Sequence, residues 1–177
     1  MPGSLVDPAP EERRWQFAIG VDDPRAPDVR ALIVTHLASS HAVTPPGHVH
    51  ALDVDGLLDP TVTFFAARLH GTLLGVGALK ELDPLHGELK SMHTVESARR
   101  QGVGLAMVEH LLSVAAIRHY ERVSLETGTM PYFAPARKLY ETIGFVQCEP
   151  FADYTTNPHS ICMSIAVERA AQPSRDA

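Results

Sequence analysis

Several features that identify particular classes of protein are scarce in this chain of 177 residues. It has only two cysteines, Cys148 and Cys162, which is too few for a disulfide framework, and their spacing matches no zinc motif. Both lie in apolar, strand-like segments, so we interpret them as structural thiols in a reducing cytoplasm. The net charge is −6, whereas nucleic-acid-binding domains carry a basic patch, so we expect no nucleic-acid partner.

Long apolar runs are also missing. No segment is long enough to cross a bilayer, and the opening residues MPGSLVDPAPEERR lack the apolar stretch of a signal peptide. We therefore expect a cytoplasmic protein with no membrane partner. The length and the 45% hydrophobic content fit one domain with a real core. The Pro-, Ala- and charge-rich ends predict flexible tails at 1–12 and 169–177 around a domain at 13–168.

Hydrophobic periodicity and turn residues predict the element order β-α-α-β-β-β-α-β-α-β-β. Strands are expected at 15–21, 61–69, 72–82, 88–95, 122–127, 145–148 and 160–167. Helices are expected from an N-cap at Asp28, at 48–58 as a short helix or ordered loop, at 102–120 and at 134–143. The fold class is an α/β sandwich: one domain with a mixed, mostly antiparallel central sheet flanked by helices.

One junction carries a specific chemical indication. After the strand that ends near Val95, a short loop with Arg99 and Arg100 leads into a long helix through Gly102 and Gly104. Backbone N–H groups at a helix start lack partners and carry partial positive charge. Without side chains at the two glycines, a phosphate can approach those groups closely. The junction therefore predicts a pyrophosphate site.

Alone, this glycine pattern equally fits a helix start with no ligand. The dinucleotide fingerprint needs a third glycine, and Met107 occupies its position. The phosphate-loop pattern also fails, because no Gly-Lys-Ser/Thr follows. Binding of NAD or ATP is accordingly the weakest of the functional hypotheses.

A second motif changes this balance. The segment Arg99-x-x-Gly102-x-Gly104 resembles the acetyl-CoA signature R/Q-x-x-G-x-G/A of the GNAT superfamily of N-acetyltransferases. The segment from Ala136 to Phe145 resembles the superfamily's second motif, A-x-x-L-Y-x-x-x-G-F. The segments PPGHVHALD, GALKEL, GELKSMHT, SLETG and PFADY also look like those of a bacterial branch of small GNAT proteins. The resemblance covers nearly the whole domain.

The resemblance implies roles for particular residues. The end of one strand would offer backbone groups to the pantetheine arm of acetyl-CoA, and the glycine junction would hold the pyrophosphate. Tyr140 would direct its hydroxyl at the thioester sulfur as the general acid, rather than being only a core aromatic. Many relatives carry Asn where this chain has Phe133, so the CoA contact often supplied at this position is not expected here. Phe133 is assigned to the acceptor pocket instead. The cofactor-binding residues implied in this way are His93, Thr94, Val95, Arg99, Arg100, Gly102, Val103, Gly104 and Leu105.

Two glutamates are candidates for the general base. Glu126 lies near the carboxyl end of a parallel-type strand, where open α/β sheets bind ligands. Glu88 is the rival, because relatives often place a base on that preceding strand. For each glutamate, an ordinary ion pair is an equally good interpretation.

Other residues are candidates for the acceptor pocket. His50 is assigned to it because the first helical region covers this pocket in the family, and no metal is expected at His48 and His50 for want of a third ligand. Lys90 and Met92 alternate with His93, so regular pleating places one set in the cleft and the other against the helices. A bulge, common in this strand of the family, would shift that assignment.

The function expected is acetyl transfer from acetyl-CoA to a small amine. A non-catalytic CoA-binding or sensing module of the same fold is the alternative, against which the presence of Tyr140 and both glutamates argues. The fold names no acceptor, because members acetylate amino acids, polyamines, antibiotics, peptides and proteins. A homodimer would be common for the family.

Overall fold

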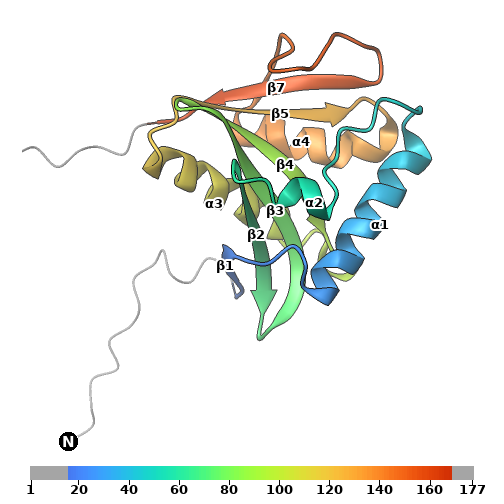
Figure 1. Cartoon of the computed structure of the whole chain (residues 1–177), viewed down its shortest axis with the longest axis vertical. Coiled ribbons are helices and arrows are strands. Elements are labelled where there is room, and N and C mark those ends of the chain that lie inside the picture. Colours follow the sequence, from blue (N-terminus) through green and yellow to red (C-terminus); the bar gives the residue numbers. More distant parts are fainter. Residues whose placement is uncertain (1–15, 169–177) are drawn as a thin grey trace, which may run out of the picture.

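The predicted mixed sheet is confirmed in a computed structural model, which describes residues 16–168. Seven strands form one sheet in the order β1-β2-β3-β4-β5-β7-β6 (Figure 1). The strands are β1 (Ala18–Val21), β2 (Val62–Leu69), β3 (Thr72–Asp83), β4 (His86–Thr94), β5 (Arg122–Gly128), β6 (Val146–Cys148) and β7 (Ser160–Ala166). The helices are α1 (Pro27–Val43), α2 (Val54–Leu57), α3 (Val103–Ile117) and α4 (Ala134–Ile143), with short 3-10 turns η2 (Glu96–Ala98) and η3 (Pro131–Phe133). Only β4 and β5 pair in parallel; the other neighbours are antiparallel.

Helices cover both faces of the sheet, with α1 and α2 on one face and α3 and α4 on the other (Figure 1). The alternation along β2 explains this arrangement. Phe64 and Ala66 belong to a core with α1 and α2, whereas Phe65 and Ala67 belong to a core with α3 and α4. Because both faces are buried, β2 and β3 carry nearly continuous apolar runs along their central residues.

Local signals placed most element ends correctly. His70 and Gly71 both have positive φ, at 48° and 85°, and make the tight turn predicted between β2 and β3. Gly144, at φ 115°, ends α4, and the next amide, that of Phe145, donates to the Tyr140 carbonyl at 3.0 Å. The long helix ends at Ile117, before the predicted residue 120, because His119 adopts a left-handed conformation with φ 62°.

One predicted cap is wrong. Asp28 does not cap α1, which begins one residue earlier, at Pro27, with no side-chain cap. Proline suits the first helical position, because the N–H that it lacks would have no partner there. The Asp28 carboxylate instead accepts from the Arg68 guanidinium at 2.6 Å, and Asp22 binds the same arginine at 2.7 Å. This pair of ion pairs fixes the start of α1 against β1 and β2.

The first predicted strand and the two predicted tails lie at the ends of the described residues or beyond them. The first strand, predicted at 15–21, is confirmed over Ala18–Val21. Trp15 and the whole of both predicted tails, 1–12 and 169–177, lie outside the described residues. Within residues 16–168, no helix has the length and apolar character needed to cross a membrane. Both cysteines are free thiols and face each other across β6 and β7, as Cys148 opposite Cys162.

Candidate functional site

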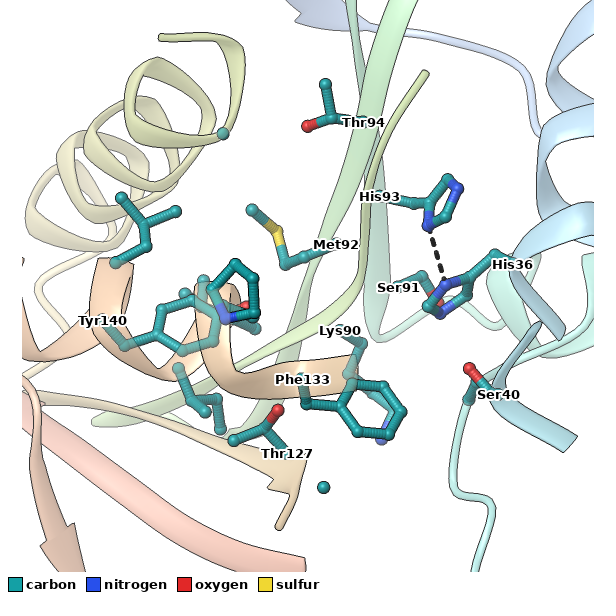
Figure 2. A pocket seen from close by; sticks show the side chains of 18 of the residues that line it. His36, Ser40, Lys90, Ser91, Met92, His93, Thr94, Thr127, Phe133 and Tyr140 are labelled. Atoms are coloured by element: carbon teal, nitrogen blue, oxygen red, sulfur yellow. Dashed lines mark hydrogen bonds between the residues drawn. The ribbon is translucent and has the colours of Figure 1, made fainter. Parts of the chain in front are cut away.

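A cavity of about 710 Å³ opens where β4 and β5 separate. These two strands pair only over three residues, from His86 opposite Arg122 to Glu88 opposite Ser124. Beyond that point they diverge, and side chains from α1, α3 and α4 surround the gap (Figure 2). The parallel pair is thus open at the carboxyl end of β5, the position where α/β sheets bind ligands.

A bulge in β4 shapes the floor of this cavity. Val76 lies opposite His93 and Ala78 opposite Lys90, so that two β4 residues face the single Gly77. Ser91, in the bulge, has a φ of 54°, and its hydroxyl is buried with no hydrogen-bond partner among the described residues.

The bulge shifts the alternation of side chains. Regular pleating would put Lys90 and Met92 on one face, but Met92 packs with Leu89 in the core that contains α3. Lys90 and His93 therefore face the opposite side of the sheet, toward α1. The grouping of Lys90 with Met92 does not hold, and the alternative with a bulge is confirmed.

The start of α3 forms one end of the cavity. Gly102 is the N-cap in a left-handed conformation, with φ 84°, and no side chain caps the helix. The first-turn amides, which have no partner within a helix, therefore lie at the cavity, together with Arg99 and Arg100. A Cβ at Gly104 would point between Leu139, at 3.3 Å, and Thr94, at 3.7 Å. This end provides unpaired N–H groups and positive charge for an anionic ligand.

Val95 is not part of the cavity lining. Its amide donates to the Leu74 carbonyl at 2.8 Å, and its carbonyl accepts from the Ala98 amide at 2.9 Å. Both of its backbone groups are therefore occupied within the protein. The other site residues predicted from the sequence all line the cavity: His50, Glu88, Lys90, Met92, His93, Thr94, Arg99, Arg100, Gly102, Val103, Gly104, Leu105, Glu126, Phe133 and Tyr140.

Tyr140 projects from α4 into the middle of the cavity wall (Figure 2). Its ring packs edge-on against Phe145, with centroids 5.7 Å apart, and only 6% of the residue is exposed. Burial raises the pKa of Tyr140 well above the usual tyrosine range. The hydroxyl therefore keeps its proton and can donate it to a strongly basic atom in the cavity.

At the other end, Glu88, Lys90 and Tyr154 form a buried network. The Lys90 ammonium lies 3.0 Å from the Glu88 carboxylate, and the two side chains are 9% and 3% exposed. The Tyr154 hydroxyl donates to Glu88 at 2.5 Å and accepts from Lys90 at 2.7 Å. Burial and the Glu88 charge raise the pKa of Tyr154, so it remains protonated. Tyr154 reaches this position on the long loop between β6 and β7, which the sequence left without any element.

Glu126 differs from Glu88 in its surroundings. It lies on β5 opposite Cys162, and burial raises the pKa of its carboxyl group. A hydrogen bond from Ser160 and the charges of His50 and Lys90 partly oppose that rise. The Glu88 carboxylate already accepts hydrogen bonds from Lys90 and Tyr154. Glu126 is therefore the carboxylate better placed to take up a proton.

Histidines that the sequence did not single out also line the cavity. His36 of α1 lies 3.1 Å from His93, Nδ1 to Nδ1, so one ring donates and the other accepts (Figure 2). Burial and the neighbouring His36 and Arg99 lower the pKa of His93 to about 4, and burial lowers that of His36. Both rings are therefore neutral near pH 7.

His48 and His50, two residues apart in the sequence, contact different aromatic rings. His48 contacts the ring of His159, with centroids 4.8 Å apart, whereas His50 contacts the ring of Tyr154 at 5.1 Å. Among residues 16–168, no group of three or more His, Cys, Asp or Glu side chains is arranged to hold a metal ion. His36 and Tyr154 were assigned no role from the sequence, although Tyr154 ends the segment PFADY, because their positions depend on contacts between distant parts of the chain.

Comparison with known proteins connects this geometry to a family. The sequence matches the family described as "Acetyltransferase (GNAT) family" over residues 32–172. It is 48% identical over 146 residues to YsnE of Bacillus subtilis, described as an uncharacterized N-acetyltransferase, covering 82% of this chain and 97% of that protein. It is 46% identical over 151 residues to YedL of Escherichia coli, described in the same way, covering 85% of this chain and 95% of that protein.

Solved structures show the same fold. A protein from Klebsiella pneumoniae, proposed to be an acyl-CoA N-acyltransferase, matches with a TM-score of 0.73 at 26% identity, covering 86% of this chain and 98% of the other. A GNAT acetyltransferase from Elizabethkingia anophelis, solved with acetyl-CoA bound, matches with a TM-score of 0.64 at 15% identity. That match covers 85% of this chain and 98% of the other.

Proposed function

Because the chain belongs to the acetyltransferase (GNAT) family and is an acyltransferase, we propose that it moves the acetyl group of acetyl-CoA to the nitrogen of a small amine. One observation carries this proposal. A single cavity joins the uncapped start of α3 to the Tyr140 hydroxyl and to the Glu126 carboxylate. The donor and the proton-transfer groups can therefore meet in one space.

The residues at the α3 end suit the pyrophosphate of CoA. The unpaired first-turn amides, reached past Gly102 and Gly104, can donate to phosphate oxygens, and Arg99 and Arg100 add charge. The backbone of β4 beyond the bulge, at His93 and Thr94, lies along the cavity toward Tyr140 and suits the pantetheine arm. Acetyl-CoA supplies an activated acetyl thioester at this position.

Acetyl transfer requires two proton transfers, and a protein side chain takes part in each. An amine attacks only as the free base, so its ammonium proton must leave, and Glu126, whose pKa is raised by burial, accepts it. A C–N bond forms as the C–S bond breaks, and the leaving sulfur needs a proton. Tyr140, buried and protonated, donates that proton. The products are an N-acetyl amide and the free CoA thiol.

The test is steady-state release of CoA thiol with a panel of amines. Tyr140→Phe should lower kcat about 100-fold with little change in the KM for acetyl-CoA, because only the proton donor is lost. Tyr120→Phe is the matched control: Tyr120 is equally buried, but its hydroxyl binds Glu81 and it lies outside the cavity lining. Unchanged kcat in Tyr140→Phe would remove the acid role. No thiol release with any amine would contradict the proposed function itself.

A further inference from the structure

The Lys90 ammonium is a charged group that the reaction above does not use. It lies in the cavity lining with only 9% of its side chain exposed. Taking a lysine charge out of water is unfavourable unless other groups compensate for the lost hydration. Glu88, at 3.0 Å, and Tyr154, at 2.7 Å, provide that compensation.

The Lys90 ammonium has more N–H donors than the described residues provide acceptors. An ammonium has three N–H groups, and the described residues give Lys90 two acceptors, the Glu88 carboxylate and the Tyr154 hydroxyl. The Tyr154 hydroxyl donates its own hydrogen bond to Glu88, so an oxygen lone pair accepts the hydrogen bond from Lys90. One Lys90 N–H is therefore left for a ligand in the cavity.

A second ionisable group lies close to Lys90. Glu88 lies opposite Ser124 in the parallel pair, so Lys90 and Glu126, each two residues further along, are on the same face of the sheet, and both line the cavity. The charges of Lys90 and Glu88 act on the Glu126 carboxyl group. With Glu88 neutralising Lys90, this part of the cavity has no excess positive charge, yet it presents a cationic N–H beside a carboxylate. That pattern complements a ligand that carries both an anionic and a cationic group.

Filling the cavity removes water from the Lys90 N–H. An acceptor that is only an amine would leave this donor unpaired, which is unfavourable and lowers binding of that acceptor. An acceptor with a carboxylate next to its amine satisfies the donor. A monoanionic carboxylate also suits a site with a single spare N–H better than a phosphate does.

We propose that the acceptor is an α-amino carboxylate, with its carboxylate bound by Lys90 and its amine facing Glu126. Tyr154 is a positioning residue, which fixes Lys90 and Glu88 without touching the reacting atoms. The inference rests on the proposed acetyl transfer. The amine nitrogen forms a bond to the acetyl carbon, the C–S bond breaks, and the products are an N-acetyl amino acid and CoA thiol.

The experiment compares matched acceptors by thiol release. Each amino acid is tested beside its own amide and its decarboxylated amine, for example phenylalanine, phenylalaninamide and phenethylamine. For at least one such set, kcat/KM for the free amino acid should exceed that for the other two by about 10-fold or more. Thiol release at equal rates with all three members of every set would overturn the inference and leave the proposed function standing. No release with any acceptor would contradict both.

Variants then test the residues. Lys90→Met should remove the preference for the carboxylate, whereas Lys138→Met, which loses a charge on α4 outside the cavity lining, should retain it. Since Lys90→Met leaves Glu88 buried without its cation, Glu88→Gln/Lys90→Met is the variant to use if the single one does not fold. Tyr154→Phe keeps the ring contacts with His50 and Phe151 and should raise the amino-acid KM with little change in acetyl-CoA KM. A preference that survives in Lys90→Met, or in Glu88→Gln/Lys90→Met where the single variant does not fold, would overturn the inference.

Discussion

Gly104 gives the sharpest separation between a folding role and a ligand role for the start of α3. In Gly104→Ala, the added Cβ would lie 3.3 Å from Leu139 and 3.7 Å from Thr94, so the side chains need to give by only a few tenths of an ångström. Alanine is favoured over glycine within helices by about 1 kcal/mol, less in the first turn. The free energy of unfolding should therefore stay within about 1 kcal/mol of the wild type.

Binding of acetyl-CoA should respond differently. The new methyl group points into the space between β4 and α4 where a phosphate would approach the first-turn amides. Loss of one or two charge-assisted hydrogen bonds, each worth about 1.5–3 kcal/mol, predicts an acetyl-CoA KM raised on the order of 10- to 100-fold. The kcat at saturation should change little, because Tyr140 and Glu126 are untouched.

Two other glycines serve as references. At Gly102 the φ of 84° disfavours any L-residue, so Gly102→Ala should lose about 1–2 kcal/mol of stability as well as affinity for acetyl-CoA. Gly20 has nothing within 4 Å of its Cβ position and lies on the edge strand, so Gly20→Ala should change neither quantity. The assays are urea unfolding and thiol release against acetyl-CoA concentration. A stable Gly104→Ala with an unchanged KM would refute the assignment of this helix start to the pyrophosphate.

Three further outcomes follow from the site. Burial raises the pKa of Glu126, so kcat/KM should rise with pH through a value above the ordinary glutamate range, and Glu126→Gln should lose that limb. His93 has a pKa lowered from 6.5 to about 4, so the unfolded chain takes up a proton that the folded chain does not. Stability should thus fall as pH drops from 6.5 to 4, by up to about 3 kcal/mol, and less in His93→Asn. A Cβ at Gly128 would overlap the Phe133 ring, so Gly128→Ala should raise the acceptor KM roughly 2- to 10-fold by displacing it.

Each of these has a result that would contradict it. Glu81→Gln, outside the cavity lining, should keep the acidic limb, and loss of the limb there would mean that it does not report Glu126. Urea unfolding of His93→Asn with the wild-type pH dependence would remove His93 as its source. For Gly128→Ala, an unchanged acceptor KM would show that the Phe133 ring does not border the acceptor.

Most of the fold could be predicted because local signals determine it. The turn at His70 and Gly71 and the left-handed Gly144 each require particular residue types at particular positions, so they can be recognised from the sequence. At Asp28 a distant contact overrides the local signal. Pro27 and Asp28 are adjacent, and both residue types suit a helix start. Asp28 instead binds Arg68, 40 residues away in the sequence, and α1 begins at Pro27.

The site was predicted where a motif or resemblance described it and missed where distant segments meet. His36 lines the cavity from α1, and Tyr154, on a long loop, contacts the lining residue Glu88. No spacing in the sequence indicates the contacts of Tyr154 with Glu88 and of His36 with His93. The bulge at Ser91 decides which β4 side chains face α1, and no single residue type requires it. Register and tertiary contact, rather than local propensity, therefore determine the end of the cavity at Glu88 and Lys90.

The measurement that tests acetyl transfer most directly follows both products in one reaction. Free CoA thiol is measured colorimetrically, and the N-acetylated acceptor is measured by mass spectrometry in the same sample. If acetyl transfer is the reaction, the two products form in equal amounts, and both depend on Tyr140 and on added amine. Thiol release without an acetylated acceptor, or acetyl-CoA binding without either product from any amine, would contradict it.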